Sequence, residues 1–368
     1  MNDQNYIQLA LDLALKGIGN VNPNPLVGSV IVKNNQIIGQ GYHERYGGPH
    51  AERNALTNCT SSPKGATLYV TLEPCCHQGK TPPCTEAIIK SGIAKVVVGT
   101  LDPNKLVAGK GVKLLRNAGI EVVVGVLEEK CKSINEIFFH YITKKTPFVV
   151  LKYAMTMDGK ITIETGQSTW ITGELARRNV HKDRNHYSAI MVGIETVLID
   201  NPMLTCRIEN GRNPIRIVCD SRLRTPLDSN IVTTANQIRT IIATTTKDLS
   251  AHKPYINKGC EILTIPQKGK HIDLQKLMQK LGIIEIDSIL LEGGSTLNFS
   301  ALESKIVRKV QCYIAPKLFG GSHAKTPVGG KGFASVSSAI RLKNSIFSQI
   351  GEDFLIESEV DYSCLQEL

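Results

Sequence analysis

Short apolar segments that resemble buried strands alternate along this chain with segments of helical spacing, and the alternation breaks once. Strands are predicted in the first part at 66–72, 95–99 and 121–125. The break at 143–147 combines charge with a proline, directly before a new apolar segment at 148–151. Two α/β domains, 1–145 and 146–368, follow from this pattern, and a length of 368 residues favours the same number.

Other elements can also be placed. Apolar residues at helical spacing predict a helix over 7–15, and two apolar runs around 33–35 predict a hairpin. Helices are expected after His50 and after Cys84, and a single helix is expected after 125, ending near Tyr141. Buried strands in the second part are predicted at 189–193, 215–219, 240–244 and 288–291. Residues 225–285 receive no functional role.

The charge is basic and evenly spread. The chain has a net charge of +10, with 16 basic and 11 acidic residues before Thr146 and 27 and 22 from there on. No basic arm or stripe stands out, so we expect phosphorylated small molecules as partners and no nucleic acid. No stretch of about 18 apolar residues is present, so we expect no membrane contact and a cytoplasmic protein with reduced cysteines. A homo-oligomer is compatible with the sequence.

The strongest pattern is His50-Ala51-Glu52 followed by the loop 73–84, which contains Cys75 and Cys84. One imidazole and two thiolates provide three ligands for one zinc ion per chain, and a catalytic site keeps its fourth position for water. Zinc lowers the pKa of a bound water, and Glu52 is close enough in sequence to His50 to move protons. A histidine, a glutamate and a proline-cysteine pair form the signature of zinc deaminases.

Local structure supports this ligand set. Pro82-Pro83 is suited to begin a helix, which places Cys84 in the first turn, where the dipole favours a thiolate. Eight residues separate Cys75 from Cys84, more than in the short form of the motif. Two alternatives remain: Cys76 could replace Cys75 as ligand, or Cys76 or His77 could close a structural site as fourth ligand.

The loop 71–84 resembles that of the bifunctional riboflavin-biosynthesis deaminase-reductases, the RibD or RibG family. Segments 22–28, 102–104 and 107–111 resemble other loops of that family, although Lys105 stands where many members have proline. The resemblance implies a cytidine-deaminase-like zinc domain. It also implies that five residues hold the pyrimidine, ribose or phosphate: Asn24, His43, Lys80, Asp102 and Asn104.

The second part contains a possible phosphate-binding turn. A strand at 288–292 leads into the turn Gly293-Gly294-Ser295-Thr296 and then a helix from Leu297, which would point backbone N–H groups at phosphate oxygens. Segments 152–160, 168–172 and 193–207 resemble the reductase half of the same family, which has a dihydrofolate-reductase-like fold. The resemblance implies NADPH contacts from Ala154, Trp170, Thr196, Asp200, Gly294, Ser295 and Thr296, and substrate contacts from Ser168, Arg184, Leu204, Arg207 and Glu292.

The function implied is that of a hydrolase and an oxidoreductase in one chain. The first domain would deaminate 2,5-diamino-6-ribosylamino-4(3H)-pyrimidinone 5′-phosphate by zinc-hydroxide attack, with Glu52 as acid and base. The second would reduce the ribosyl side chain to ribityl with NADPH. The alternatives are a tRNA adenosine or cytidine deaminase fused to another domain, and a structural-zinc nucleotide-binding protein.

Overall fold

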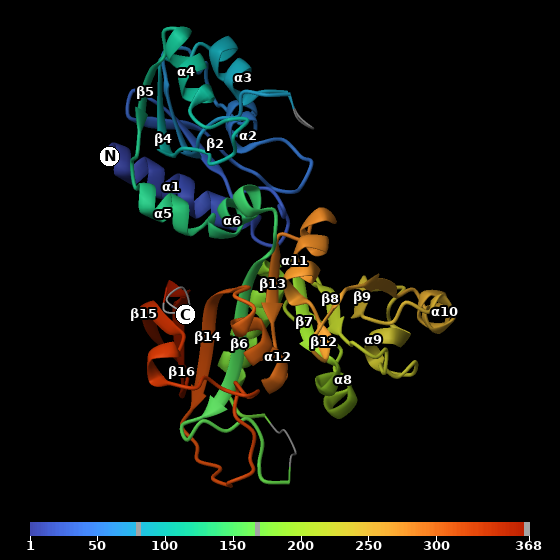
Figure 1. The fold of residues 1–368 in the computed structure, drawn as a ribbon. Coiled ribbons are helices and arrows are strands. Elements are labelled where there is room, and N and C mark those ends of the chain that lie inside the picture. Colours follow the sequence, from blue (N-terminus) through green and yellow to red (C-terminus); the bar gives the residue numbers. More distant parts are fainter. Residues whose placement is uncertain (79–81, 166–169, 364–368) are drawn as a thin grey trace. The chain divides into compact units, whose positions relative to one another are not determined.

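The computed structural model describes residues 1–78, 82–165 and 170–363, and the chain divides into two compact units, Met1–Lys145 and Thr146–Leu368 (Figure 1). Each unit has its own mixed sheet with helices on both faces, so the predicted α/β class is confirmed. In the described part of the chain, no helix combines the length and the apolar character needed to cross a bilayer.

The first unit is built on a five-stranded sheet of order β2-β1-β3-β4-β5, in which β1 is antiparallel to β2 and β3 while β3, β4 and β5 are parallel. Its strands are β1 Gly28–Lys33, β2 Gln36–Tyr42, β3 Thr67–Leu72, β4 Lys95–Thr100 and β5 Glu121–Val124. Its helices are α1 Asp3–Ala14, the 3₁₀ helix η1 Leu15–Gly17, α2 Ala51–Thr57, α3 Cys84–Ser91, α4 Lys110–Asn117, α5 Glu128–Ser133 and α6 Glu136–Lys144.

Strand alternation divides the core of this unit into two layers. On β3 and β4, Leu68, Val70 and Val96 face a cluster that includes residues of α2, α3 and α4. Tyr69 and Val97 face the opposite cluster, which includes residues of α1 and α5. The sheet is therefore covered on both sides, as Figure 1 shows, and β3 and β4 carry buried apolar residues on both faces for that reason.

The prediction of one helix after residue 125 was wrong, because α5 and α6 are separate. Asn135 divides them: its side chain accepts a hydrogen bond from Leu26 N at 2.8 Å and donates to Leu26 O at 2.9 Å. Its backbone lies outside the helical region, with φ −115° and ψ 16°. The amide therefore ties the inter-helix junction to the segment before β1, a contact between residues more than 100 positions apart in sequence.

The second unit has a nine-stranded sheet of order β10-β9-β8-β7-β13-β6-β14-β16-β15, and a small ribbon of β11 and β12. Neighbours from β10 to β14 are parallel, whereas β16 and β15 are antiparallel. The strands are β6 Phe148–Thr156, β7 Ala189–Gly193, β8 Ile215–Cys219, β9 Thr240–Thr244, β10 Glu261–Thr264, β11 Gln267–Lys268, β12 His271–Ile272, β13 Ser288–Leu291, β14 Val307–Ala315, β15 Arg341–Ile350 and β16 Asp353–Asp361.

Helices cover both faces of this sheet as well. They are α7 Glu174–His186, α8 Ile194–Asp200, α9 Asn230–Thr233, α10 Leu249–Asn257, α11 Leu274–Ile283, α12 Ser295–Glu303 and the 3₁₀ helix η2 Val336–Ser338. One core cluster joins strand residues to α11 and α12, and another joins them to α8, α9 and α10. The strands predicted over 189–193, 215–219, 240–244 and 288–291 are confirmed, whereas β15 and β16 were not predicted.

Candidate active sites

Three metal-ligating side chains of the first unit lie together. His50 precedes α2, Cys75 follows β3, and Cys84 begins α3. His50 Nδ1 is 3.5 Å from Cys75 Sγ and 3.4 Å from Cys84 Sγ, and the three donor atoms all lie within 4.8 Å of one another. Tetrahedral zinc, with bonds of about 2.0–2.1 Å to nitrogen and about 2.3 Å to sulfur, places such atoms about 3.6 Å apart. The donor set therefore fits zinc in both type and spacing.

The surrounding backbone fixes the two sulfur atoms. Cys84 N donates a hydrogen bond to Cys75 Sγ at 3.3 Å, and Thr85 N donates to Cys75 O at 3.2 Å. Hydrogen bonding from Cys84 lowers the pKa of the Cys75 thiol, against the opposing effect of burial. Arg53 of α2 donates to the carbonyls of Pro82 and Pro83 at 3.2 and 3.1 Å, which fixes the approach to Cys84.

Glu52 lies in the first turn of α2 and is 3% exposed. Burial raises the pKa of its carboxyl group, and the negative charge of Cys75 acts in the same direction. It is hydrogen-bonded to Cys84 and is not one of the three clustered donors. A buried carboxyl group that can hold a proton beside a metal site is suited to acid-base catalysis.

Cys76 and His77 lie outside this cluster of donors. Cys76 Sγ contacts Leu106 O at 3.9 Å, and burial raises the pKa of its thiol. Among the described residues, the group that could hold a metal contains Cys75 and neither Cys76 nor His77.

Asn24 and His43 form a hydrogen-bonded pair near the cluster of His50, Cys75 and Cys84. His43 Nδ1 is 3.0 Å from Pro49 O, and His43 Nε2 is 3.0 Å from Asn24 Nδ2. Since a carbonyl can only accept, Nδ1 carries the proton and Nε2 accepts from the amide of Asn24. Burial lowers the pKa of His43, which favours this neutral form, and its ring meets the His50 ring edge-on at 5.4 Å.

Asp102 and Asn104 follow β4 in a loop whose polar side chains cap the backbone. Asn104 N donates to Asp102 Oδ1 at 2.7 Å, and Leu106 N donates to Asn104 Oδ1 at 3.1 Å. Burial raises the pKa of Asp102 to about 6. Lys80, the remaining residue predicted to bind the deaminase substrate, lies outside the described residues.

The second unit contains a cavity of about 860 Å³ at the carboxyl ends of its parallel strands. Its wall includes seven of the residues predicted to bind NADPH or substrate: Ala154, Thr196, Asp200, Glu292, Gly294, Ser295 and Thr296. Gly293 and Gly294 have φ values of +116° and +83°, a region that favours glycine, and α12 begins directly after them. Backbone N–H groups at this turn can therefore approach a phosphate closely.

Other predicted residues lie apart from this wall. Trp170 is 68% exposed, with the Arg177 guanidinium 4.6 Å from its ring centre, and it is not among the lining residues. The cavity wall also excludes Arg184, Leu204 and Arg207. Arg184 nevertheless binds Glu292, which is a lining residue. Ser168 lies outside the described residues.

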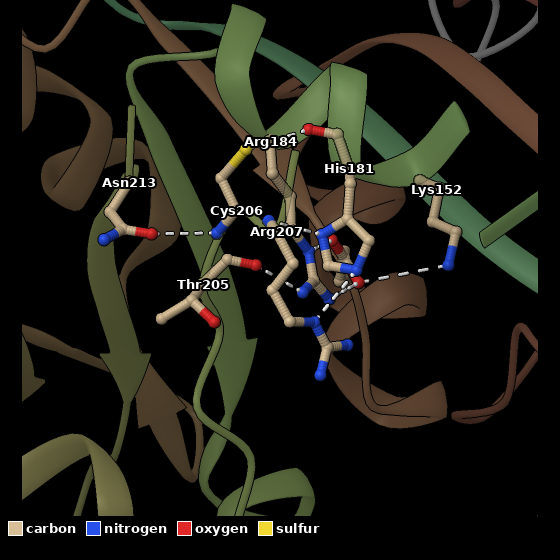
Figure 2. Close-up of polar contacts among 8 residues, drawn as sticks. Lys152, His181, Arg184, Thr205, Cys206, Arg207 and Asn213 are labelled. Atoms are coloured by element: carbon tan, nitrogen blue, oxygen red, sulfur yellow. Dashed lines mark hydrogen bonds and ion pairs between the residues drawn. The ribbon is translucent and has the colours of Figure 1, made fainter. Parts of the chain in front are cut away.

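Arg184 and Glu292 form a bidentate ion pair, with Nε–Oε1 and Nη2–Oε2 distances of 2.7 and 2.8 Å. Lys152 Nζ lies 3.9 Å from Glu292 Oε2. Arg184 Nη1 also donates to Thr205 O at 2.9 Å (Figure 2). Burial by itself would raise the pKa of Glu292, but the two cations outweigh it and lower this pKa to about 2. Burial lowers the pKa of Lys152.

Arg207 lies against His181 of α7, as Figure 2 shows. Its backbone N donates to His181 Nδ1 at 3.2 Å, and its Nε lies 3.2 Å from His181 Nε2. Burial, together with Arg184 and Arg207, lowers the pKa of His181 to about 4, so the ring is neutral. A neutral imidazole has one accepting nitrogen, so it accepts from only one of these donors at a time.

Loss of the Arg184–Glu292 ion pair should lower the stability of the protein, and an exposed ion pair of the same chain provides the control. Arg184→Met leaves a buried carboxylate with only Lys152 nearby, and we expect a loss of about 3 kcal/mol in the free energy of unfolding in urea at pH 7. Arg239→Met removes an equivalent fork on the exposed Glu261, at 2.7 and 3.0 Å, and should cost less than about 1 kcal/mol. Equal losses in the two variants would contradict this account.

Acid titration of the same variants provides a second readout. The pKa of Glu292 in the folded protein is about 2, below its ordinary value of 4.5. The stabilisation from this group is therefore present above about pH 4.5 and is lost as the pH falls toward 2. Arg184→Met should therefore weaken the dependence of the free energy of unfolding on pH between about 4.5 and 2.

Some lining residues of the cavity had no predicted role. Lys152 is one of them, and another group comes from the end of β8 and from the β11–β12 ribbon: Ser221, Arg222, Arg224, Lys270, His271 and Ile272. The first three of that group could have been found, because ligands of parallel sheets bind at the carboxyl ends of strands. The ribbon carries no comparable signal in the sequence.

Comparison with known proteins assigns the chain to a family. The family described as the RibD C-terminal domain matches residues 147–356, and the cytidine and deoxycytidylate deaminase zinc-binding region matches residues 1–100. The chain is 56% identical to riboflavin biosynthesis protein RibD of Actinobacillus pleuropneumoniae, over 97% of this chain and 95% of that protein. The chain belongs to the RibD family.

Solved RibD structures have the same fold. The Thermotoga maritima diaminohydroxyphosphoribosylaminopyrimidine deaminase/5-amino-6-(5-phosphoribosylamino)uracil reductase is 41% identical, with a TM-score of 0.85 and coverage of 97% of this chain and 98% of that one. Acinetobacter baumannii RibD, form 1, is 36% identical, with a TM-score of 0.88 and coverage of 98% and 99%.

The RibD assignment confirms the resemblance noted in the sequence. The protein has a cytidine-deaminase-like zinc domain followed by a RibD reductase domain. It is a bifunctional riboflavin-biosynthesis enzyme, a deaminase and a reductase, with zinc and NADPH as its cofactors. The deaminase fused to an unrelated domain and the structural-zinc binding protein are thereby set aside.

Proposed function

We propose that residues 1–145 deaminate 2,5-diamino-6-ribosylamino-4(3H)-pyrimidinone 5′-phosphate and that residues 146–368 then reduce the ribosyl side chain to ribityl. The observation that carries the first step is the cluster of His50, Cys75 and Cys84, with buried Glu52 beside it. The cavity bounded by the Gly293-Gly294 turn supports the second step. The division into domains is supported by the two compact units.

In the deaminase step, His50, Cys75 and Cys84 hold the zinc ion. Zinc, when bound, makes water nucleophilic near neutral pH. Glu52 takes a proton from the attacking water and delivers one to the exocyclic amine as the C–O bond forms and the C–N bond breaks, so that ammonia leaves. Its raised pKa, caused by burial, suits a group that must both accept and donate within one cycle.

The pyrimidine and its ribose phosphate would be bound around this centre. Asn24 uses one amide N–H on His43, which leaves the amide oxygen available to a ligand. His43 is fixed in one tautomer by Pro49 O and keeps the Asn24 amide oriented. Asp102 and Asn104 are held by their own loop, and Lys80 remains a proposed contact.

In the reductase step, NADPH, when bound, would supply a hydride to C1 of the ribosyl group; the bond between C1 and the ring oxygen breaks, and that oxygen takes up a proton. The Gly294–Thr296 turn, Ala154, Thr196 and Asp200 are proposed to position the cofactor, since all of them line the cavity. Glu292, held by Arg184, is proposed to contact the substrate from the same wall. Ser168, Arg184, Leu204 and Arg207 remain proposed substrate contacts, and Trp170 remains a proposed cofactor contact.

The order of the two steps can be tested with a deaminase-inactive protein. Cys84→Ser protein should oxidise no NADPH when given the diaminopyrimidine ribotide, because its deaminase site no longer makes the deaminated pyrimidine that the reductase step uses. The same protein should oxidise NADPH when given the deaminated pyrimidine, at a rate within about twofold of wild type. NADPH oxidation is followed by absorbance at the nicotinamide band. Oxidation of NADPH by this variant in the presence of the diaminopyrimidine ribotide would contradict the proposed order.

Phosphorylated pyrimidines are the proposed partners, and we also propose a cytoplasmic location. None of the cysteines among the described residues forms a disulfide, which fits a reducing compartment.

A further inference from the structure

Glu73 follows β3 and is 3% exposed, and both oxygens of its carboxylate accept hydrogen bonds from backbone N–H groups. Oε2 accepts from Asp102 N at 3.3 Å and from Gly109 N at 2.9 Å, and Oε1 accepts from Val112 N at 3.1 Å. Hydrogen bonds to an ionised acceptor are stronger than neutral ones, so three donors on one buried carboxylate form a firm anchor. The steps proposed above give this residue no role.

All three donors belong to the segment 102–112, which runs from the end of β4 into α4 and carries Asp102 and Asn104. Its own backbone hydrogen bonds are short-range, such as Val107 N to Asn104 O at 2.8 Å and Lys110 N to Val107 O at 2.7 Å. These bonds shape the loop but do not attach it to the metal-binding loop. The Glu73 carboxylate makes that attachment at both ends of the segment. Between these ends, Cys76 Sγ adds a longer contact to Leu106 O at 3.9 Å.

A glycine is required on the other side of the same contact. A Cβ atom at Gly111 would lie 2.3 Å from Pro74 O and 3.1 Å from Glu73 Oε1, and the first of these is a backbone atom that cannot turn aside. The first turn of α4 therefore packs directly on the Glu73-Pro74 backbone. Glu73 and Gly111 are two independent sequence requirements of one contact.

The chain leaves Glu73 toward the metal ligands. Cys75 is two residues further on, and its carbonyl accepts from Thr85 N and Thr85 Oγ1 at 3.2 and 3.3 Å. Residues 73–75 are thus held at one end by the segment 102–112 and at the other by α3. A shift of Glu73 relative to that segment changes the distance between the metal centre and Asp102.

We propose that Glu73 is a positioning residue of the deaminase site, which holds the segment 102–112, with Asp102 and Asn104, at a fixed place beside the metal ligands. This inference rests on the proposed function, because it assigns Asp102 and Asn104 to the substrate. Glu73 touches neither substrate nor metal. Its loss should therefore weaken substrate binding more than it slows the chemical step or releases zinc.

Two variants of the full-length zinc-loaded protein test the contact from opposite sides. In Glu73→Gln, the amide nitrogen must face one of the three N–H donors, and in Gly111→Ala the new Cβ meets Pro74 O. We expect each to raise KM for the diaminopyrimidine ribotide about tenfold or more, with a smaller change in kcat and unchanged zinc content. The double variant should be no worse than the poorer single variant, because both break one contact.

Hydrogen exchange gives a readout that does not depend on catalysis. Amides of 102–112 should exchange faster in Glu73→Gln than in wild type. The matched control is Leu11→Ala, a buried position of α1 in the opposite core layer, which should lower Tm without raising KM or speeding exchange in 102–112. Reduction of the deaminated pyrimidine should be unchanged in all variants.

The outcomes separate this inference from the proposed function. Unchanged KM and unchanged exchange in Glu73→Gln would overturn it, and so would an equal rise of KM in Leu11→Ala. Additive effects in the double variant would also overturn it. Absence of ammonia release from wild-type protein would contradict the proposed function and, with it, the substrate role assigned to the segment.

Discussion

Replacing Glu52 with glutamine should reduce ammonia release by about 10²–10⁴-fold while zinc stays bound. Glutamine keeps the size of the side chain and lies outside the three clustered donors, so the metal centre is retained. It cannot exchange a proton with water or with the leaving amine. Measurement of ammonia release, with zinc content by atomic absorption on the same sample, checks both parts of the expectation.

Glu86→Gln is the matched control for this change. Glu86 also lies in the first turn of a helix of the same unit, but it is exposed. Its replacement should leave deamination within about twofold of wild type, since it removes only a surface charge. Full activity in Glu52→Gln would exclude the proton-transfer role, and loss of zinc from that variant would show that Glu52 acts instead on the metal site.

Cys75→Ser and Cys84→Ser should each lose stoichiometric zinc and, with it, deamination. A serine hydroxyl does not ionise near neutral pH, whereas the thiolates supply both charge and soft donors to the ion. With His50 and a single sulfur left, only two of the three clustered donors remain. Reduction of the deaminated pyrimidine should continue, because its proposed residues belong to the other unit.

Cys76→Ser supplies the control, because it is the neighbouring thiol and lies outside the clustered donors. It should keep one zinc ion per chain and most of the deaminase activity. Retention of zinc by Cys75→Ser together with its loss from Cys76→Ser would mean that the loop presents the other cysteine to the metal.

The sequence was most informative where function depends on residues close together in the chain. His50 with Glu52, and Cys75 with Cys84, each lie within ten residues. The helix that follows His50 and the helix that begins at Cys84 are signalled by proline and by the onset of helical spacing. The strand-turn-helix at 288–297 could be found for the same reason, although α12 begins at Ser295, two residues earlier than predicted.

Features that depend on distant partners were missed. Glu73 is the first residue of the loop 73–84, but its hydrogen-bond donors are backbone N–H groups about 30 to 40 residues further along the chain. No side-chain pattern reveals such donors. Asn135 divides α5 from α6 through a contact with Leu26. Lys152 reaches the cavity wall from β6, an interior strand of the nine-stranded sheet. The β11–β12 ribbon reaches the cavity from a region without a recognisable pattern.

The central claim is that one chain performs both steps in order, and one assay tests it most directly. Wild-type protein with zinc is given the diaminopyrimidine ribotide and NADPH, and ammonia and NADPH are followed in the same sample. We expect one NADPH oxidised for each ammonia released, with ammonia release beginning first. Ammonia release without NADPH oxidation, or NADPH oxidation without ammonia release, would contradict the account.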